Sequence, residues 1–148
     1  AHQGLREYQA PVEYGRSEII RKGKKIAVLG VGSMIPSCME ICKGLKDDGY
    51  DPTFVNARFV KPLDVDLLDE LAKDHSLFVT VEENVKSGGY GEHVSAYMEA
   101  CHPEIRVLSA AVWDRFVPQG NVESLRSRIG LGVEDIRQAI EDSEELRE

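Results

Sequence analysis

The chain has 148 residues, of which 42% are hydrophobic and 30% are charged, so it is expected to form one globular domain with a core of its own. Its formal net charge of −8 argues against nucleic acid as a main partner, because phosphate binding needs a basic surface. No apolar run is long enough to span a membrane and no secretion signal opens the chain, so we expect no membrane partner.

Strand and helix patterns alternate along most of the chain. Residues 1–15 have no sustained period and are interpreted as a linker, which leaves 16–148 as the domain. The predicted strands are Ser17–Arg21, Lys25–Leu29, Pro52–Asn56, Ser76–Val81 and Ile105–Val112. Helices are predicted from Pro36 to Gly49, after the N-cap Asp64, around Val94–Cys101, at Val122–Ile129 and at Val133–Leu146.

This alternation is typical of an α/β fold in which helices cover both faces of a mostly parallel sheet. In such sheets the loops that follow the carboxyl ends of the strands carry function. Those loops are Gly30–Ser33, Ala57–Leu63, Glu82–Gly91 and Trp113–Gly120.

The first of these loops does not match a dinucleotide site. Gly30-Val31-Gly32 follows a strand, but Ile35 stands where the third glycine of the fingerprint belongs. Asn56 and Arg58 end the next strand, where an acidic residue would bind a ribose. A tight turn from strand to helix is the better interpretation. Arg58 and Lys61 could hold a phosphate, although charged loop residues usually face water.

The Glu82–Gly91 loop is the most distinctive. Adjacent strand residues point to opposite faces, so Glu82 and Glu83 are not expected to form an acid/base pair. Gly88, Gly89 and Gly91 allow positive φ and close backbone approach, and we expect Gly89 to have positive φ. The favoured role is structural, with the carboxylates accepting N–H groups of the loop; contact with another domain and direct chemistry are the alternatives.

The Trp113–Gly120 loop mixes charged and large apolar residues, which is typical of an interface anchor. Asp114, Arg115 and Phe116 are the candidate contact residues, and an ordered loop without a partner is the alternative.

The chain also has three cysteines and an acidic C-terminal segment. Cys38, Cys42 and Cys101 form no CxxC motif and lack zinc spacing, so we expect buried or half-buried free thiols in a reducing compartment. The segment Glu134–Glu148 holds seven acidic and two basic residues. We interpret it as a solvated last helix that frays, with an acidic interaction tail as the alternative.

Four motifs, in this order and spacing, resemble the third, C-terminal domain of the 1-deoxy-D-xylulose-5-phosphate synthase family. They are Arg58–Asp64 (RFVKPLD), Val79–Asn84 (VTVEEN), the Gly88-Gly89-x-Gly91 run and Asp114–Gly120 (DRFVPQG). The resemblance extends over roughly residues 12 to 142 and takes in Lys25–Gly32 and Leu131–Ile140. The Glu-Glu and glycine pieces alone also fit transketolase C-terminal domains in general. Tyr90 departs from the small residue often found at its position.

The resemblance implies a three-layer α/β/α domain with a mostly parallel five-stranded sheet and one antiparallel strand, Ser17–Arg21. It also implies a parent transferase that condenses pyruvate with glyceraldehyde 3-phosphate for isoprenoid precursor, thiamine and pyridoxal synthesis. That parent uses thiamine diphosphate and Mg²⁺ and works as a homodimer, in a bacterial cytoplasm or in a plastid.

No catalytic, cofactor-binding or metal-binding residue carries over to this chain, because the motifs that bind the coenzyme are absent from it. The expected partners are therefore the first two domains of the same enzyme and the homodimer partner. The expected contact residues are Glu82, Glu83, Gly88, Gly89, Gly91, Asp114, Arg115 and Phe116. Two alternatives stay open: a stand-alone module that bridges subunits in a transketolase or 2-oxoacid dehydrogenase relative, and a small-ligand sensor that uses the glycine loop.

Overall fold

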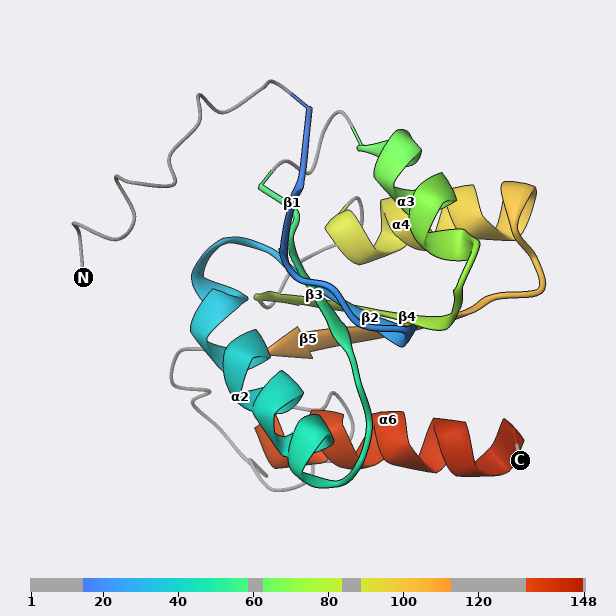
Figure 1. Cartoon of the computed structure of the whole chain (residues 1–148). Helices are drawn as coiled ribbons and strands as arrows, with labels where there is room; N and C mark the ends of the chain where they lie inside the picture. The colour runs from blue at the N-terminus through green and yellow to red at the C-terminus, as the bar shows by residue number, and fades with distance from the viewer. Residues whose placement is uncertain (1–14, 59–62, 84–88, 113–132, 148) are drawn as a thin grey trace, which may run out of the picture.

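A five-stranded sheet forms the centre of the chain in a computed structural model, which describes residues 15–58, 63–83, 89–112 and 133–147 (Figure 1). The strands are β1 (Glu18–Arg21), β2 (Lys25–Gly30), β3 (Thr53–Asn56), β4 (His75–Glu83) and β5 (Arg106–Val112). The helices are α2 (Ile35–Asp47), α3 (Val65–Ala72), α4 (Tyr90–Cys101) and α6 (Val133–Arg147), with a short 3-10 turn at Gly32–Met34.

The strand order is β1-β3-β2-β4-β5. β1 pairs with β3 antiparallel and every other pairing is parallel. Helices α2 and α6 cover one face, and α3 and α4 cover the other (Figure 1). The predicted three-layer fold is therefore confirmed, including the one antiparallel strand.

The alternation of side chains along the central strands builds two cores. In β2, Ile26 and Val28 pack with α2 and α6, whereas Ala27 and Leu29 pack on the α3/α4 face. Both faces are covered, so the strand is apolar along most of its length instead of alternating with polar residues. By the same alternation, Phe78, Thr80 and Glu82 of β4 point toward the α3/α4 face.

Helix α6 is more than a solvated acidic helix. Ile136 and Ile140 are buried against α2, because they recur four residues apart on one face. Arg137 pairs with Asp48 at the end of α2 and with Glu141 on its own helix. The expectation of a solvated helix therefore holds for its exposed acidic face and is wrong for the Ile136 face. The predicted helix at Val122–Ile129 lies outside the described residues.

The cysteines divide by location. Cys38 and Cys42 face the core from α2, as their spacing predicts. Cys101 is exposed, which corrects the expectation of burial; it is the last residue of α4, beyond the part that packs on the sheet. No helix in the described ranges is long and apolar enough to cross a membrane.

Thiol labelling should distinguish these positions. Burial raises the pKa of both the Cys38 and the Cys42 thiols to about 12, so at pH 8 they stay protonated as well as covered. We expect iodoacetamide at pH 8 to label Cys101 rapidly and the other two only in urea, as read by peptide mass spectrometry. Equal labelling of all three in the folded protein would contradict this arrangement.

Candidate functional site

The carboxyl end of β4 and the first turn of α4 form the candidate site. Glu82 is 6% exposed, and its carboxylate accepts two hydrogen bonds from backbone amides. Oε1 accepts from the Tyr90 N–H at 2.8 Å and Oε2 from the Gly91 N–H at 2.7 Å. The N-terminus of a helix has free N–H groups and favours a negative charge beside it. The Glu82 carboxylate therefore stabilises the N-terminus of α4. Glu82 thus accepts N–H groups of the Glu82–Gly91 segment, as the favoured interpretation of the sequence predicts.

Gly91 is where the absence of a side chain matters. A Cβ built on it would lie 2.6 Å from Oε2 of Glu82 and 2.7 Å from Oγ1 of Thr80. Thr80 is fully buried, and its hydroxyl has no hydrogen-bond partner among the described residues. The helix can reach the Glu82 carboxylate only because position 91 carries no side chain.

Gly89 does not have the predicted positive φ. It is the N-cap of α4 with φ −77° and ψ −179°, an extended conformation that any residue adopts. Glu82 and Glu83 belong to β4, and Tyr90 and Gly91 belong to α4, so the loop between strand and helix is shorter than predicted. The glycine requirement therefore lies at Gly91 and comes from close approach.

Tyr90 extends this cluster toward α3. Its side chain is 2% exposed and packs in the core of the α3/α4 face. Burial raises the pKa of the Tyr90 phenol, and the nearby carboxylates of Asp64 and Glu82 raise it further. Tyr90 is thus held as a neutral phenol between the caps of the two helices.

Asp64 caps α3, as predicted. Its Oδ1 accepts from the Leu67 N–H at 3.2 Å, and its Oδ2 accepts from the Ser17 N–H at 2.8 Å. Arg16 donates to the same carboxylate at 3.1 Å. The Ser17 hydroxyl donates to the Ala57 carbonyl at 2.9 Å. The motif that ends in Asp64 therefore fastens the chain entering β1 to the carboxyl edge of the sheet.

Replacing Asp64 with Ala should lower the free energy of unfolding by about 1–2 kcal/mol, because two backbone donors lose their acceptor. Urea unfolding measures this loss. Asp66→Ala is the matched control, since Asp66 also pairs with Arg16 but caps nothing and is 73% exposed. Equal losses for the two variants would show that the cap contributes nothing.

Arg58 does not offer a free cation for a phosphate. Its guanidinium pairs with Glu18 at 2.8 Å. It adopts φ 63°, and its N–H donates to the Asn56 side chain at 3.1 Å. Lys61 lies outside the described residues. The Gly30 turn is also structural, since a Cβ there would lie 2.6 Å from the Cys38 sulfur.

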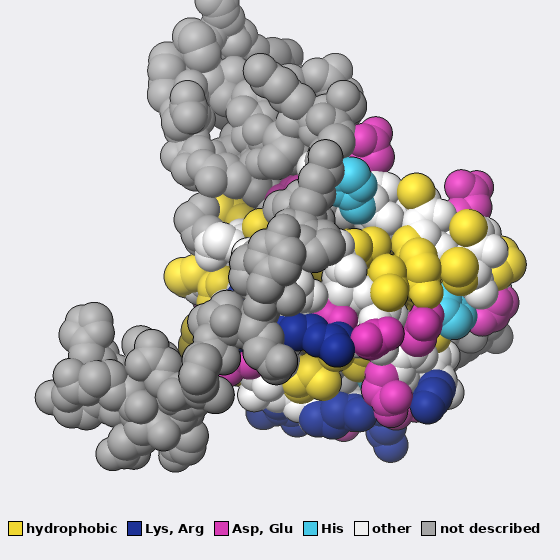
Figure 2. All heavy atoms as spheres, turned by 90° about the horizontal axis from the view of Figure 1, so that it is seen from above, with side chains coloured by type: hydrophobic (Ala, Val, Ile, Leu, Met, Phe, Trp, Pro, Cys, Tyr) yellow, Lys and Arg dark blue, Asp and Glu magenta, His cyan; other side chains and the backbone are white. Residues whose placement is uncertain are grey.

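Several predicted contact residues cannot be placed. Gly88, Asp114, Arg115 and Phe116 lie outside the described residues, as does the side chain of Glu83. Within the described ranges no group of three or more His, Cys, Asp or Glu residues is arranged to hold a metal ion. On the face seen in Figure 2, Asp and Glu side chains are interspersed with hydrophobic ones, and Lys and Arg lie along the lower edge and near the centre.

Two polar clusters were not predicted. His75 is 4% exposed, with Nδ1 2.9 Å from the Leu71 carbonyl and Nε2 2.7 Å from the Thr53 hydroxyl. On the surface, Asp69 of α3 accepts from the Tyr97 hydroxyl at 2.7 Å and lies 2.8 Å from Nε2 of His102. Thr53 and His75 are 22 residues apart in the sequence, and Asp69 and Tyr97 are 28 apart. No local spacing pattern in the sequence predicts such pairs.

Sequence comparison finds relatives that match most of the chain. The family model "Transketolase, C-terminal domain" matches residues 15–136. A 1-deoxy-D-xylulose-5-phosphate synthase of Lachnoclostridium phytofermentans is 39% identical over 92% of this chain, and one of Dictyoglomus thermophilum is 39% identical over 93%. The chain spans 22% of the length of each of these relatives.

Solved structures agree in fold. A split gene transketolase, described as an inactive beta4 tetramer, superposes with a TM-score of 0.74 and 29% identity, over 90% of this chain and 43% of that chain. A transketolase of Campylobacter jejuni superposes with a TM-score of 0.56 at 18% identity, over 91% of this chain and 20% of that one, a likeness of fold alone.

Proposed function

The chain belongs to the transketolase C-terminal domain family, and on that premise we propose that it is the last domain of a 1-deoxy-D-xylulose-5-phosphate synthase. The observation that carries the proposal is the 39% identity to two such enzymes over more than nine-tenths of the chain. The parent would condense pyruvate with glyceraldehyde 3-phosphate and release carbon dioxide, for isoprenoid precursor synthesis.

In this proposal the domain contributes packing surface instead of catalytic groups. Thiamine diphosphate and Mg²⁺ would bind in the other domains of the parent. Glu82 is a buried acid, and both of its oxygens are engaged by amides of α4. It therefore does not fit the role of a free metal ligand or of a group that protonates a coenzyme.

The carboxyl edge of the sheet is the proposed contact with the second domain and with the dimer partner. Glu82 and Gly91 would act indirectly. They would fix the position at which α4 begins, and therefore the position of Gly89, which precedes the helix. Glu83, Asp114, Arg115 and Phe116 are proposed as direct contacts. The carboxylate of Glu82 already occupies the first amides of α4, which weakens the alternative of a phosphate sensor at this helix end.

An assay of the isolated chain tests this role. With pyruvate, glyceraldehyde 3-phosphate, thiamine diphosphate and Mg²⁺ present, we expect a folded protein by circular dichroism and no release of carbon dioxide. Turnover by this chain alone would overturn the proposal.

A second candidate is a separate subunit that supplies the same surface. The observation that favours it is the likeness to a split gene transketolase, of whose solved chain the matching part makes up 43%. An antibody raised against this chain would distinguish the two in source cells. A band several times larger than 16.5 kDa supports a domain of one long enzyme, and a shorter band that copurifies with a larger partner supports the subunit.

A further inference from the structure

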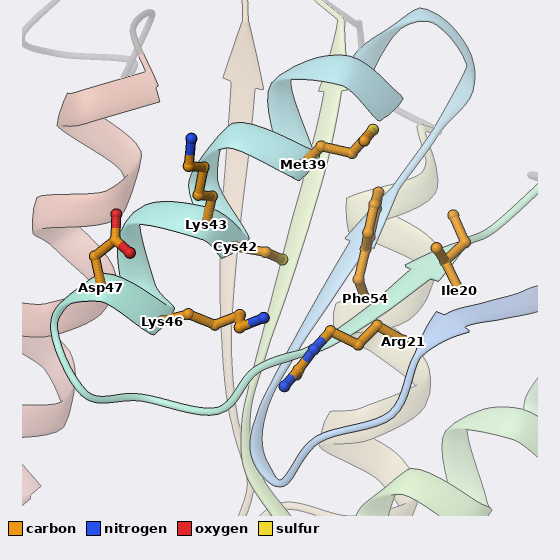
Figure 3. Close-up of a pocket in the computed structure, with 8 residues that line it drawn as sticks. All are labelled: Ile20, Arg21, Met39, Cys42, Lys43, Lys46, Asp47 and Phe54. Atoms are coloured by element: carbon orange, nitrogen blue, oxygen red, sulfur yellow. The ribbon is translucent and has the colours of Figure 1, made fainter. Parts of the chain in front are cut away.

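A groove lies at the opposite edge of the sheet from β5, between β1, β3 and α2 (Figure 3). Its volume is about 430 Å³, within the range of small-molecule sites. The residues that line it are Ile20, Arg21, Met39, Cys42, Lys43, Lys46, Asp47 and Phe54. None of them belongs to the Glu82 site.

One half of the groove is apolar. Ile20 is 46% exposed and Met39 is 57% exposed, and they are two of the three large hydrophobic residues exposed in the described part of the chain. Between them stands Phe54, whose ring faces the groove while the residue is 4% exposed (Figure 3). Two exposed apolar side chains beside a buried aromatic floor form a surface that gains free energy when it is covered.

The other half is positively charged. Lys46 of α2 and Arg21 of β1 extend toward each other from opposite walls, below the sulfur of Cys42 (Figure 3). Lys43 and Asp47 point away from this position (Figure 3). Arg21 is balanced by Asp51 at 2.7 Å, whereas Lys46 makes no ion pair with any described residue.

Arg21 and Lys46 both lie close enough to Cys42 to act on its thiol. Burial raises the pKa of its thiol, and the charges of Arg21 and Lys46 are the two influences that lower it. Both cations therefore act on one buried sulfur at the base of the groove. Arg21 is paired with Asp51 and also donates to the Pro52 carbonyl at 2.7 Å, so Lys46 is the main attraction for an anion at this position and the Arg21 guanidinium adds to it.

We infer that this groove binds a small amphiphilic organic anion, with its apolar body on Ile20, Met39 and Phe54 and its acidic group between Lys46 and Arg21. A simple apolar patch would not need the two converging cations, and an inorganic anion would not use the apolar wall. The chain as a whole carries a net charge of −8, so a positively charged groove departs from its general surface.

Titration with octanoate tests the inference, with octan-1-ol and octylamine as probes of equal chain length. In ¹H–¹⁵N spectra of the 148-residue chain, octanoate should shift the amides of Ile20, Arg21 and Cys42. Its affinity should exceed that of octanol by about tenfold, and octylamine should not bind.

Lys46→Glu should weaken octanoate binding by about tenfold or more and leave octanol binding unchanged. Lys73→Glu is the matched control: it makes the same charge change at an exposed lysine that does not line the groove, so affinity should fall less than about threefold. Ile20→Ser should weaken the binding of both octanoate and octanol. Because Ile20 is exposed, this substitution should not prevent folding. Equal affinity for octanoate and octanol, equal effects of the two lysine variants, or shifts at other residues would each overturn the inference.

Discussion

Replacing Glu82 with Ala should lower the free energy of unfolding by about 3 kcal/mol. The change removes two charge-assisted hydrogen bonds and leaves the Tyr90 and Gly91 N–H groups buried without an acceptor. Glu82→Gln keeps the size and one acceptor oxygen, so it should lose roughly half as much. Urea unfolding followed by circular dichroism measures both.

Glu99→Ala is the matched control, because Glu99 is an exposed glutamate on the same helix α4. Its unfolding free energy should change by less than about 0.5 kcal/mol. If Glu82→Ala were no more destabilising than this control, the carboxylate would not anchor α4. The alternative of a direct chemical role for Glu82 would then be favoured. In that case the Glu82→Ala variant of the parent enzyme would lose turnover while keeping normal stability.

Replacing Gly91 with Ala should destabilise the domain by about 1–3 kcal/mol. In an ordinary helix this substitution stabilises by about 1 kcal/mol through helix propensity. A loss of stability would therefore show that steric overlap at position 91 is the larger effect. The added Cβ would meet Oε2 of Glu82, which is held by two amides, and the hydroxyl of the buried Thr80. The carboxylate cannot move away without breaking its hydrogen bonds, and the Thr80 side chain is fully buried, so overlap should outweigh propensity.

Gly44→Ala provides the contrast within α2. Its Cβ would lie 2.5 Å from Cδ of Arg137, so that side chain must shift and its ion pairs with Asp48 and Glu141 must rearrange. Ion pairs near the surface contribute little and the helix gains propensity, so we expect a loss of less than about 1 kcal/mol. The Glu82→Ala, Gly91→Ala double variant should lose less than the sum of the single losses, because removing the carboxylate relieves the overlap. Strict additivity would contradict the proposed contact.

Much of the fold follows from local pattern. Strands such as Lys25–Leu29 are continuous apolar runs, and the period of two within them determines which residues meet which helix layer. The Asp64 cap was predicted because a carboxylate before an apolar helical stripe has a specific local role. The antiparallel orientation of β1 came from the family resemblance, since four residues of pattern carry no direction.

The site was predicted less completely, for a physical reason. Alternation along β4 separates Glu82 from Glu83, and that much is local. Which glycine is required depends on how closely α4 approaches the sheet, and this distance exists only in the folded domain. The sequence therefore pointed to Gly89 for its conformation, whereas the close approach occurs at Gly91. The pairing of Thr53 with His75 and the burial of Ile136 likewise depend on tertiary packing.

Reconstitution would show whether this domain completes a 1-deoxy-D-xylulose-5-phosphate synthase. A 1-deoxy-D-xylulose-5-phosphate synthase would be truncated to remove the segment that aligns with this chain, and the 148-residue chain would be added back. Carbon dioxide release and molecular mass by light scattering would be followed together. We expect the truncated enzyme to be inactive, and the added chain to bind it, restore the dimer and recover turnover. Full activity of the truncated enzyme without the chain, or no binding of the chain to it, would contradict the account.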